Sequence, residues 1–131
     1  MATHPVQFTF SAPCTGLSET DKDFGLQLGT DGNYKKLTDN ARVAGKLINT
    51  EKADTGSTPK ACTVEYKGVL RFAIADTVTL SNADLQKGIK GAANGAIKLV
   101  AYSTTYDPNL VGRVSAWDNT NGNKWVDVII P

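Results

Sequence analysis

Short segments in which apolar and polar residues alternate recur along this chain, and no long segment has the periodicity of a helix. Residues 6–12 are the clearest case, because they alternate without an error and then meet Pro13. A period of two residues is typical of a strand with one buried face. Such segments, about 8–12 residues apart and joined by turns, predict a sandwich or a barrel. We therefore expect an all-β fold: a compact β-barrel or β-sandwich-like domain with short strands and an extended N-terminal arm.

Turn residues divide the remaining strands. Asp31-Gly32 lies between two apolar runs and predicts a hairpin, and Asn121-Gly122 predicts another near the C-terminal end. Gly68 falls on the apolar face of a long alternating region and indicates a bend or bulge, so that region could hold two strands. Besides 6–12, the expected strands are 24–28, 34–37, 42–48, 62–75, 96–102, 111–117 and 124–130.

The segments between these strands are assigned from their composition. Residues 80–88 could hold one helical turn, with Ser81 or Asn82 as its N-cap. The glycine-rich stretch 88–95 is interpreted as turns, and the polar stretch 49–60 as a long exposed loop. A chain of 131 residues predicts one core. The expected organisation is therefore an N-terminal strand or arm over 1–12 and a single β domain over 13–131.

The charge and the hydropathy of the chain argue against nucleic acid and membranes as partners. The chain has 14 Lys+Arg and 13 Asp+Glu, a net charge of +1, so we expect no general affinity for the phosphates of nucleic acid. No apolar run approaches the roughly 20 residues that span a bilayer, so no membrane partner is expected. The first residues lack the basic and apolar regions of a signal peptide, which favours synthesis in the cytoplasm.

Few side chains are available for metal binding or nucleophilic catalysis. Cys14 and Cys62 are the two cysteines, and in a reducing compartment we expect two free, packed thiols. His4 is the single histidine, beside Pro5 at the N-terminus, where it is poorly placed to act as a base. One histidine and two distant cysteines do not make a standard zinc site. We therefore expect no cofactor, no metal and no catalytic residues.

One short motif resembles a catalytic one. Asp54-Thr55-Gly56 is similar to the Asp-Thr-Gly of retroviral-type aspartic proteases, which act as dimers, and residues 110–113 are similar to a downstream segment of that family. Their chemistry needs two carboxylates that share a proton at rigid, buried positions. Here the polar residues 49–53 stand where the family has an apolar strand. We expect a loop turn and no enzyme, with the protease as the alternative.

Four apolar side chains are candidates for binding a partner. Val6, Phe8 and Phe10 share one face of the first strand, where they either pack in the core or dock on a neighbouring chain. A terminal strand without a hairpin partner is suited to adding to another sheet edge. Trp117 and Trp125 flank the last turn, and Trp117 is the fourth candidate. A further alternative is therefore a carbohydrate- or receptor-binding β module that uses the tryptophans.

From about residue 24 to its end, the chain resembles the capsid cement, or head decoration, proteins of tailed bacteriophages. The resemblance lies in the order of several segments, none of them specific alone. These segments are GLQL (25–28), VAGKL (43–47), CTVEYKGVL (62–70), LVGRVSAW (110–117) and WVDVII (125–130). The N-terminal segment and the loop 49–60 match this family less well.

This resemblance implies a structural role in a virion. Members are compact and β-barrel-like, and their copies, often trimers, bind the outside of an expanded capsid and clamp neighbouring capsomers. It implies the major capsid protein as partner, a homotrimer as assembly and the capsid exterior as location. The expected function is therefore capsid stabilisation. The family has no local signature for its contact residues, and from the arm and the exposed loop of this chain we expect the contacts in residues 1–12 and 49–60.

Overall fold

The computed structural model describes residues 8–51 and 58–131. These residues are mostly β, with 46% in strands, 8% in helix and no helix of seven or more residues among them, which confirms the all-β expectation. The strands are β1 (Phe8–Pro13), β2 (Gly25–Leu28), β3 (Tyr34–Lys36), β4 (Gly45–Thr50), β5 (Ala61–Ala73), β6 (Gly88–Gly91), β7 (Ile97–Val100), β8 (Arg113–Asp118) and β9 (Trp125–Ile130). Three short 3₁₀ turns are η1 (Glu19–Asp21), η2 (Asn82–Asp84) and η3 (Ala93–Gly95).

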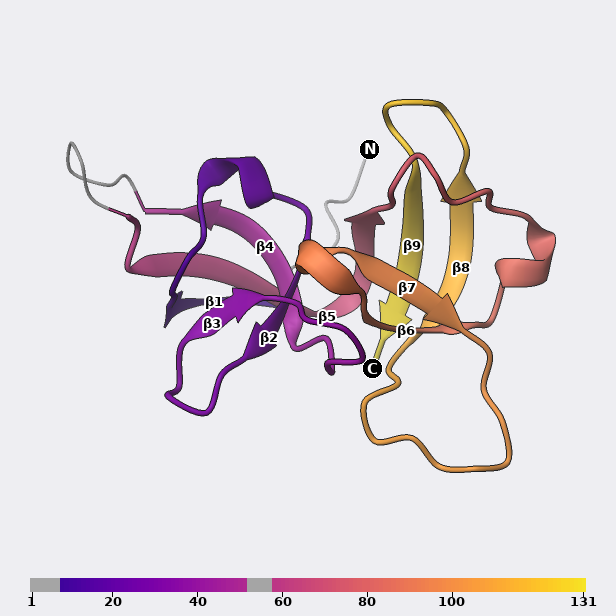
Figure 1. Cartoon of the computed structure of the whole chain (residues 1–131), viewed down its shortest axis with the longest axis horizontal. Coiled ribbons are helices and arrows are strands. Elements are labelled where there is room, and N and C mark those ends of the chain that lie inside the picture. The colour runs from indigo at the N-terminus through magenta and orange to yellow at the C-terminus, as the bar shows by residue number, and fades with distance from the viewer. Residues whose placement is uncertain (1–7, 52–57) are drawn as a thin grey trace, which may run out of the picture.

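Strand β5 joins the two halves of the molecule (Figure 1). Up to Lys67 it lies between β1 and β4, and from Gly68 onward it pairs with β9. Gly68 has a φ of 99°, which a residue with a side chain rarely adopts. The expected irregularity at Gly68 is confirmed, and the long alternating region is one strand shared by two lobes.

The first lobe is a small closed barrel. Its strands follow the order β3-β2-β4-β5, and β1 pairs with the free side of β5. The ring closes because Cys14 forms a parallel bridge with Tyr34, and the Thr15 N–H donates to the Tyr34 carbonyl at 3.0 Å. The buried residues inside it are Ala12, Cys14, Leu17, Leu26, Leu47, Cys62 and Val64.

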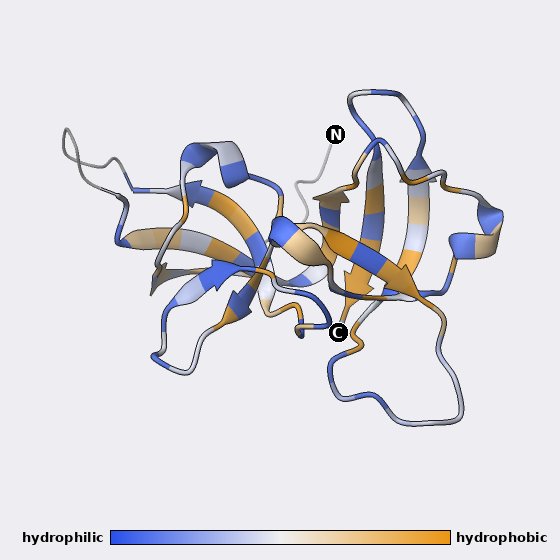
Figure 2. Ribbon diagram, viewed as in Figure 1, coloured by the Kyte–Doolittle hydropathy of each residue, from blue (hydrophilic) through white to orange (hydrophobic). Residues whose placement is uncertain are grey.

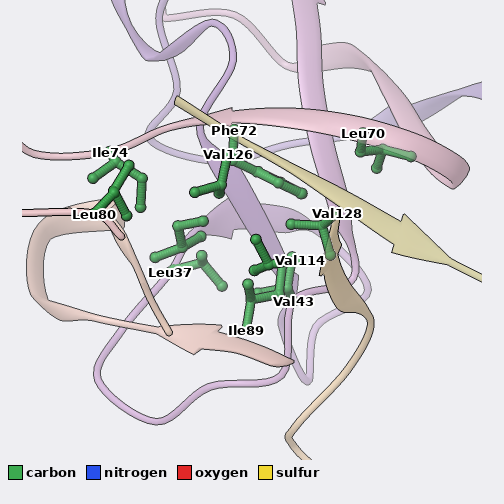
Figure 3. Packing of buried hydrophobic residues seen from close by; sticks show 11 residues of the cluster. Leu37, Val43, Leu70, Phe72, Ile74, Leu80, Ile89, Val114, Val126 and Val128 are labelled. Carbon is green, nitrogen blue, oxygen red and sulfur yellow. The ribbon is translucent and has the colours of Figure 1, made fainter. Parts of the chain in front are cut away.

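The second lobe is built on β5, β9 and β8, and the β6–β7 hairpin completes it. On one side, the Ile89 N–H of β6 donates to the Val111 carbonyl at 2.9 Å. On the other, the Gly91 N–H donates to the Ala41 carbonyl at 2.8 Å, beside the segment that follows β3. Phe72 lies fully buried in this core (Figure 3). Figure 2 shows that a hydrophilic band interrupts the hydrophobic residues of β7 and of β9.

The interpretation of 88–95 as turns is wrong for its first half, which is strand β6. The glycines there allow close packing of backbone. A Cβ atom on Gly88 would lie 2.8 Å from Leu110 Cδ1, and one on Gly91 would collide with the Thr38 carbonyl oxygen. A glycine inside a strand often marks such an approach. The turn itself is confined to η3, where Asn94 has a φ of 61°.

Local turn signals are confirmed. The hairpin between β2 and β3 turns at Gly32, which has a φ of 84°, and the Gly29 N–H donates to the Asn33 carbonyl at 2.8 Å. Ser81 is the N-cap of η2, and its hydroxyl accepts from the Ala83 N–H. Residues 8–12 of the expected N-terminal strand or arm form most of β1, and residues 1–7 lie outside the described range.

The carboxylate of Glu19 links η1 to β4 through two hydrogen bonds, and its titration makes stability depend on pH. Glu19 Oε1 accepts from Thr50 N and from Thr50 Oγ1, both at 2.7 Å. These bonds lower the pKa of Glu19 because they favour the charged carboxylate. A group with a lowered folded-state pKa contributes stability above its unfolded pKa, about 4.3 for Glu, and loses it as the pH falls through the folded value.

Thr50→Val should therefore raise the pKa of Glu19 toward its ordinary value, because one of the two hydrogen bonds is lost. A carboxyl NMR titration measures this, with Asp84, whose pKa is lowered mainly by Lys87, as the internal control that should not move. An unchanged Glu19 titration in the variant would contradict the assignment.

Candidate interaction surface

The structure separates the sequence-predicted partner residues. Val6 lies outside the described residues. Phe8 and Phe10 lie together on β1 in the first lobe, whereas Trp117 lies on β8 in the second. Trp117 is half-buried against the second core, and its indole N–H donates to Asn82 Oδ1 at 3.2 Å. Trp117 is therefore not part of a surface with Phe8 and Phe10.

Two tyrosines join the phenylalanines of β1, and we call Phe8, Phe10, Tyr34 and Tyr66 the aromatic surface. Phe10 meets Tyr66 and Tyr34 edge to face, with ring centroids 5.4 and 5.6 Å apart, and Phe8 meets Tyr66 at 6.2 Å. Phe8, Phe10 and Tyr66 are 37, 36 and 41% exposed. Burial raises the pKa of the Tyr34 phenol, so its hydroxyl stays neutral at physiological pH.

The aromatic surface is the open end of the first core. Alternate residues of a strand share a face, so Phe8 and Phe10 lie on the same side of β1 as the buried Ala12. In the same way Tyr66 continues the inward row of Val64 on β5. Phe8, Phe10 and Ala12 thus share one face of β1, as the alternation predicts, but only Ala12 is buried. Nothing in the described part of the chain covers the outer end of this face.

The outer edge of β1 is also available. The Cys14 N–H donates to the Lys60 carbonyl of the β5 side at 3.0 Å, so alternate residues bond β5 and those between them face away. Ser11 and Thr9 are among the outward-facing positions, and no described strand pairs with their edge. β1 contains no charged residue. Natural edge strands commonly carry charge that prevents pairing, so this edge is suited to strand addition.

Tyr66 also lines a crevice of about 560 Å³ between the lobes. The far wall includes Tyr102 and Tyr106, from the long connection between β7 and β8, and Tyr106 is 84% exposed. Arg42, which lines the crevice as well, fixes this connection by donating from Nη1 to the Pro108 carbonyl at 2.7 Å. The aromatic surface therefore continues into a hollow with further tyrosines.

One face of the Trp125 ring is covered by a cation. The Arg71 guanidinium lies over the Trp125 ring at 3.5 Å from its centroid. It is held there by Asp127, which accepts from Nε at 2.8 Å and from Nη2 at 3.1 Å. Trp117 is half-buried against the second core, so a sugar that stacks on the tryptophans would have to use the uncovered parts of the two rings.

The remaining chemical candidates fall mostly outside the described range. Asp54-Thr55-Gly56 and His4 both lie there, so the structure does not place them. Within residues 8–51 and 58–131, no group of three or more His, Cys, Asp or Glu side chains could hold a metal ion. Over the same residues, no helix is long and apolar enough to span a bilayer.

Sequence reasoning missed Tyr34 and Tyr66 as members of the surface. Tyr66 shares the apolar face of its strand with Val64 in the sequence pattern, but that pattern does not bring it next to Phe8 and Phe10. Tyr34 reaches the cluster only because β3 closes the ring next to Cys14, which no local signal indicates. Comparison with known proteins finds no matching family, no similar curated protein and no similar solved structure.

Proposed function

We propose that this chain is a structural virion protein that binds the outer surface of a phage capsid and clamps neighbouring capsomers. The partner is the major capsid protein, the chain acts as a homotrimer, and its place is the capsid exterior after synthesis in the host cytoplasm. The observation that carries the proposal is the aromatic surface next to an uncharged strand edge with which no described strand pairs.

This surface has the chemistry of a protein-binding site. Buried aromatic side chains are frequent hot spots of interfaces, and each contributes a large apolar area at a low entropic cost. Lys67 lies over the Phe8 ring at 5.0 Å and adds a positive charge at the rim. The adjacent edge of β1 supplies main-chain hydrogen-bonding groups, so a partner that presents an extended strand would satisfy both features.

The order of segments that resembles head decoration proteins supports the same role. A capsid presents many identical sites on a symmetric lattice. When copies are linked in a trimer, each further contact forms at a high effective concentration, so a small surface on each copy is sufficient. The proposal requires no catalytic centre.

A double substitution tests the surface. Phe8→Ser with Phe10→Ser should weaken binding to the phage's expanded capsids at least tenfold, because two aromatic anchors are lost. Binding is measured by cosedimentation, and far-UV circular dichroism verifies the fold. Val69→Ser, at a 62% exposed position in the second lobe, is the control that should bind normally.

A single substitution at the edge of β1 tests whether loss of binding comes from the surface or from damage to the fold when Phe8 and Phe10 are replaced. Ser11→Lys places a charge on an exposed position of β1 and leaves its hydrogen bonds to β5 intact. It should lower capsid occupancy with an unchanged melting temperature. Normal binding of both folded variants would contradict the proposed surface.

A further inference from the structure

Two buried thiols face the same interior. Cys14 and Cys62 are 5 and 3% exposed, and both belong to the core of the first lobe. Cys62 lies directly opposite Ala12, and the Cys14 N–H donates to the Lys60 carbonyl. The cysteines therefore occupy diagonal positions of one antiparallel pair, on the same face of the sheet.

Both thiols are buried and protonated. Cys14 Sγ donates to the Pro59 carbonyl at 3.6 Å, and both cysteines are free thiols in the same core. Burial is the largest cause that raises the pKa of both thiols, to about 12 for Cys62. In the closed structure both groups are therefore protonated thiols at neutral pH, and their attack on an oxidant requires local opening.

We propose that Cys14 and Cys62 form a redox pair, which a small-molecule disulfide converts into an intramolecular disulfide that fastens β1 to β5. β1 is the strand that can open to admit the oxidant, because beyond Cys14 its outer edge has no described partner. It also carries Phe8 and Phe10, so the bond fixes the strand that bears half of the aromatic surface. The inference rests on the register and the shared core, and not on the proposed capsid role. Diagonal neighbours lie roughly 7–8 Å apart, so β1 must shift toward Cys62 for the bond to form.

The reaction balances as two thiol–disulfide exchanges. The Cys14 thiolate attacks one sulfur of glutathione disulfide, forms a mixed disulfide and releases one glutathione thiolate. The Cys62 thiolate then attacks Cys14 Sγ and releases the second glutathione. Two protein thiols are oxidised, one glutathione disulfide is reduced to two thiols, and the two protein protons pass to the departing thiolates or to solvent.

Refolding in a glutathione buffer tests whether the two cysteines form a disulfide, because both thiols are accessible to the oxidant before the core closes. The full chain, reduced and unfolded, is refolded in a mixture of reduced and oxidised glutathione. The expected product has lost two hydrogen atoms in its intact mass and has no thiol that reacts with maleimide in denaturant. Its melting temperature should lie about 10 °C above that of the reduced protein, because the bond closes a long loop.

Two single variants control the assignment. Cys14→Ser and Cys62→Ser each leave one thiol, which should remain free or carry one glutathione and should not raise the melting temperature. The proposal would be overturned if the wild-type chain kept both thiols, or kept a mixed disulfide, although both sulfurs were accessible during refolding. Disulfide-linked dimers in place of the internal bond would overturn it as well.

Discussion

Replacing Phe72 by alanine should lower the free energy of unfolding by about 4 kcal/mol. Phe72 is the largest fully buried side chain, with none of its surface exposed, and it lies among residues from β5, β8 and β9 (Figure 3). Its removal loses apolar transfer free energy and leaves a cavity that the closed β framework cannot fill by collapsing. Urea denaturation followed by far-UV circular dichroism measures the change.

Val69→Ala is the matched control, because Val69 lies on the same strand and is 62% exposed. It should change stability by less than about 0.5 kcal/mol. A Phe72→Ala protein as stable as this control would show that the second lobe does not have the core described above.

Gly91→Ala should lower the free energy of unfolding by about 3 kcal/mol. A Cβ at this position would collide with the Thr38 carbonyl oxygen, which is backbone and cannot rotate away, and would lie 3.2 Å from Leu37 Cβ. The substitution must therefore push β6 away from the segment after β3. This movement breaks the hydrogen bond from the Gly91 N–H to the Ala41 carbonyl.

Gly32→Ala separates this steric effect from conformational strain. Gly32 has a φ of 84°, and a Cβ on it would have no other atom within 4 Å, so alanine there should cost about 1 kcal/mol. Equal losses at Gly32 and Gly91, measured by the same denaturation, would contradict the close approach of β6 to Thr38.

Features that depend on neighbours in sequence could be predicted from the sequence. Asp31-Gly32 and Asn121-Gly122 mark hairpins because their backbone preferences act locally, and both hairpins are present. The bend at Gly68 was also evident, because a glycine interrupted the apolar face. These signals establish the all-β class and most strand positions.

Features that depend on pairing between distant segments could not be predicted. Strand β6 looks like a run of turns because its glycines are required by Thr38 and Leu110, which are remote in sequence. The aromatic surface likewise needs the registers that bring Phe10 next to Tyr34 and Tyr66. Its residue type makes Trp117 a candidate for binding a partner, but the sequence does not show that Trp117 packs against the second core.

The aromatic surface and the edge of β1 together explain how a chain of this size could bind a large partner. The rings provide apolar area, and the strand provides directional hydrogen bonds that fix orientation. Phe8 and Phe10 are exposed at the outer end of the first core, whereas Ala12 and Val64 are buried in it. This separation allows binding and stability to be altered by different substitutions.

Electron cryomicroscopy of expanded capsids incubated with the purified protein tests the central claim most directly. The capsids are assembled from the major capsid protein that the proposal names as partner. We predict ordered density at symmetry-related sites on the outer surface, with β1, Phe8 and Phe10 turned toward the capsid and a capsid strand beside Ser11. Bare capsids at saturating protein, or bound copies whose aromatic surface faces solvent, would contradict the account.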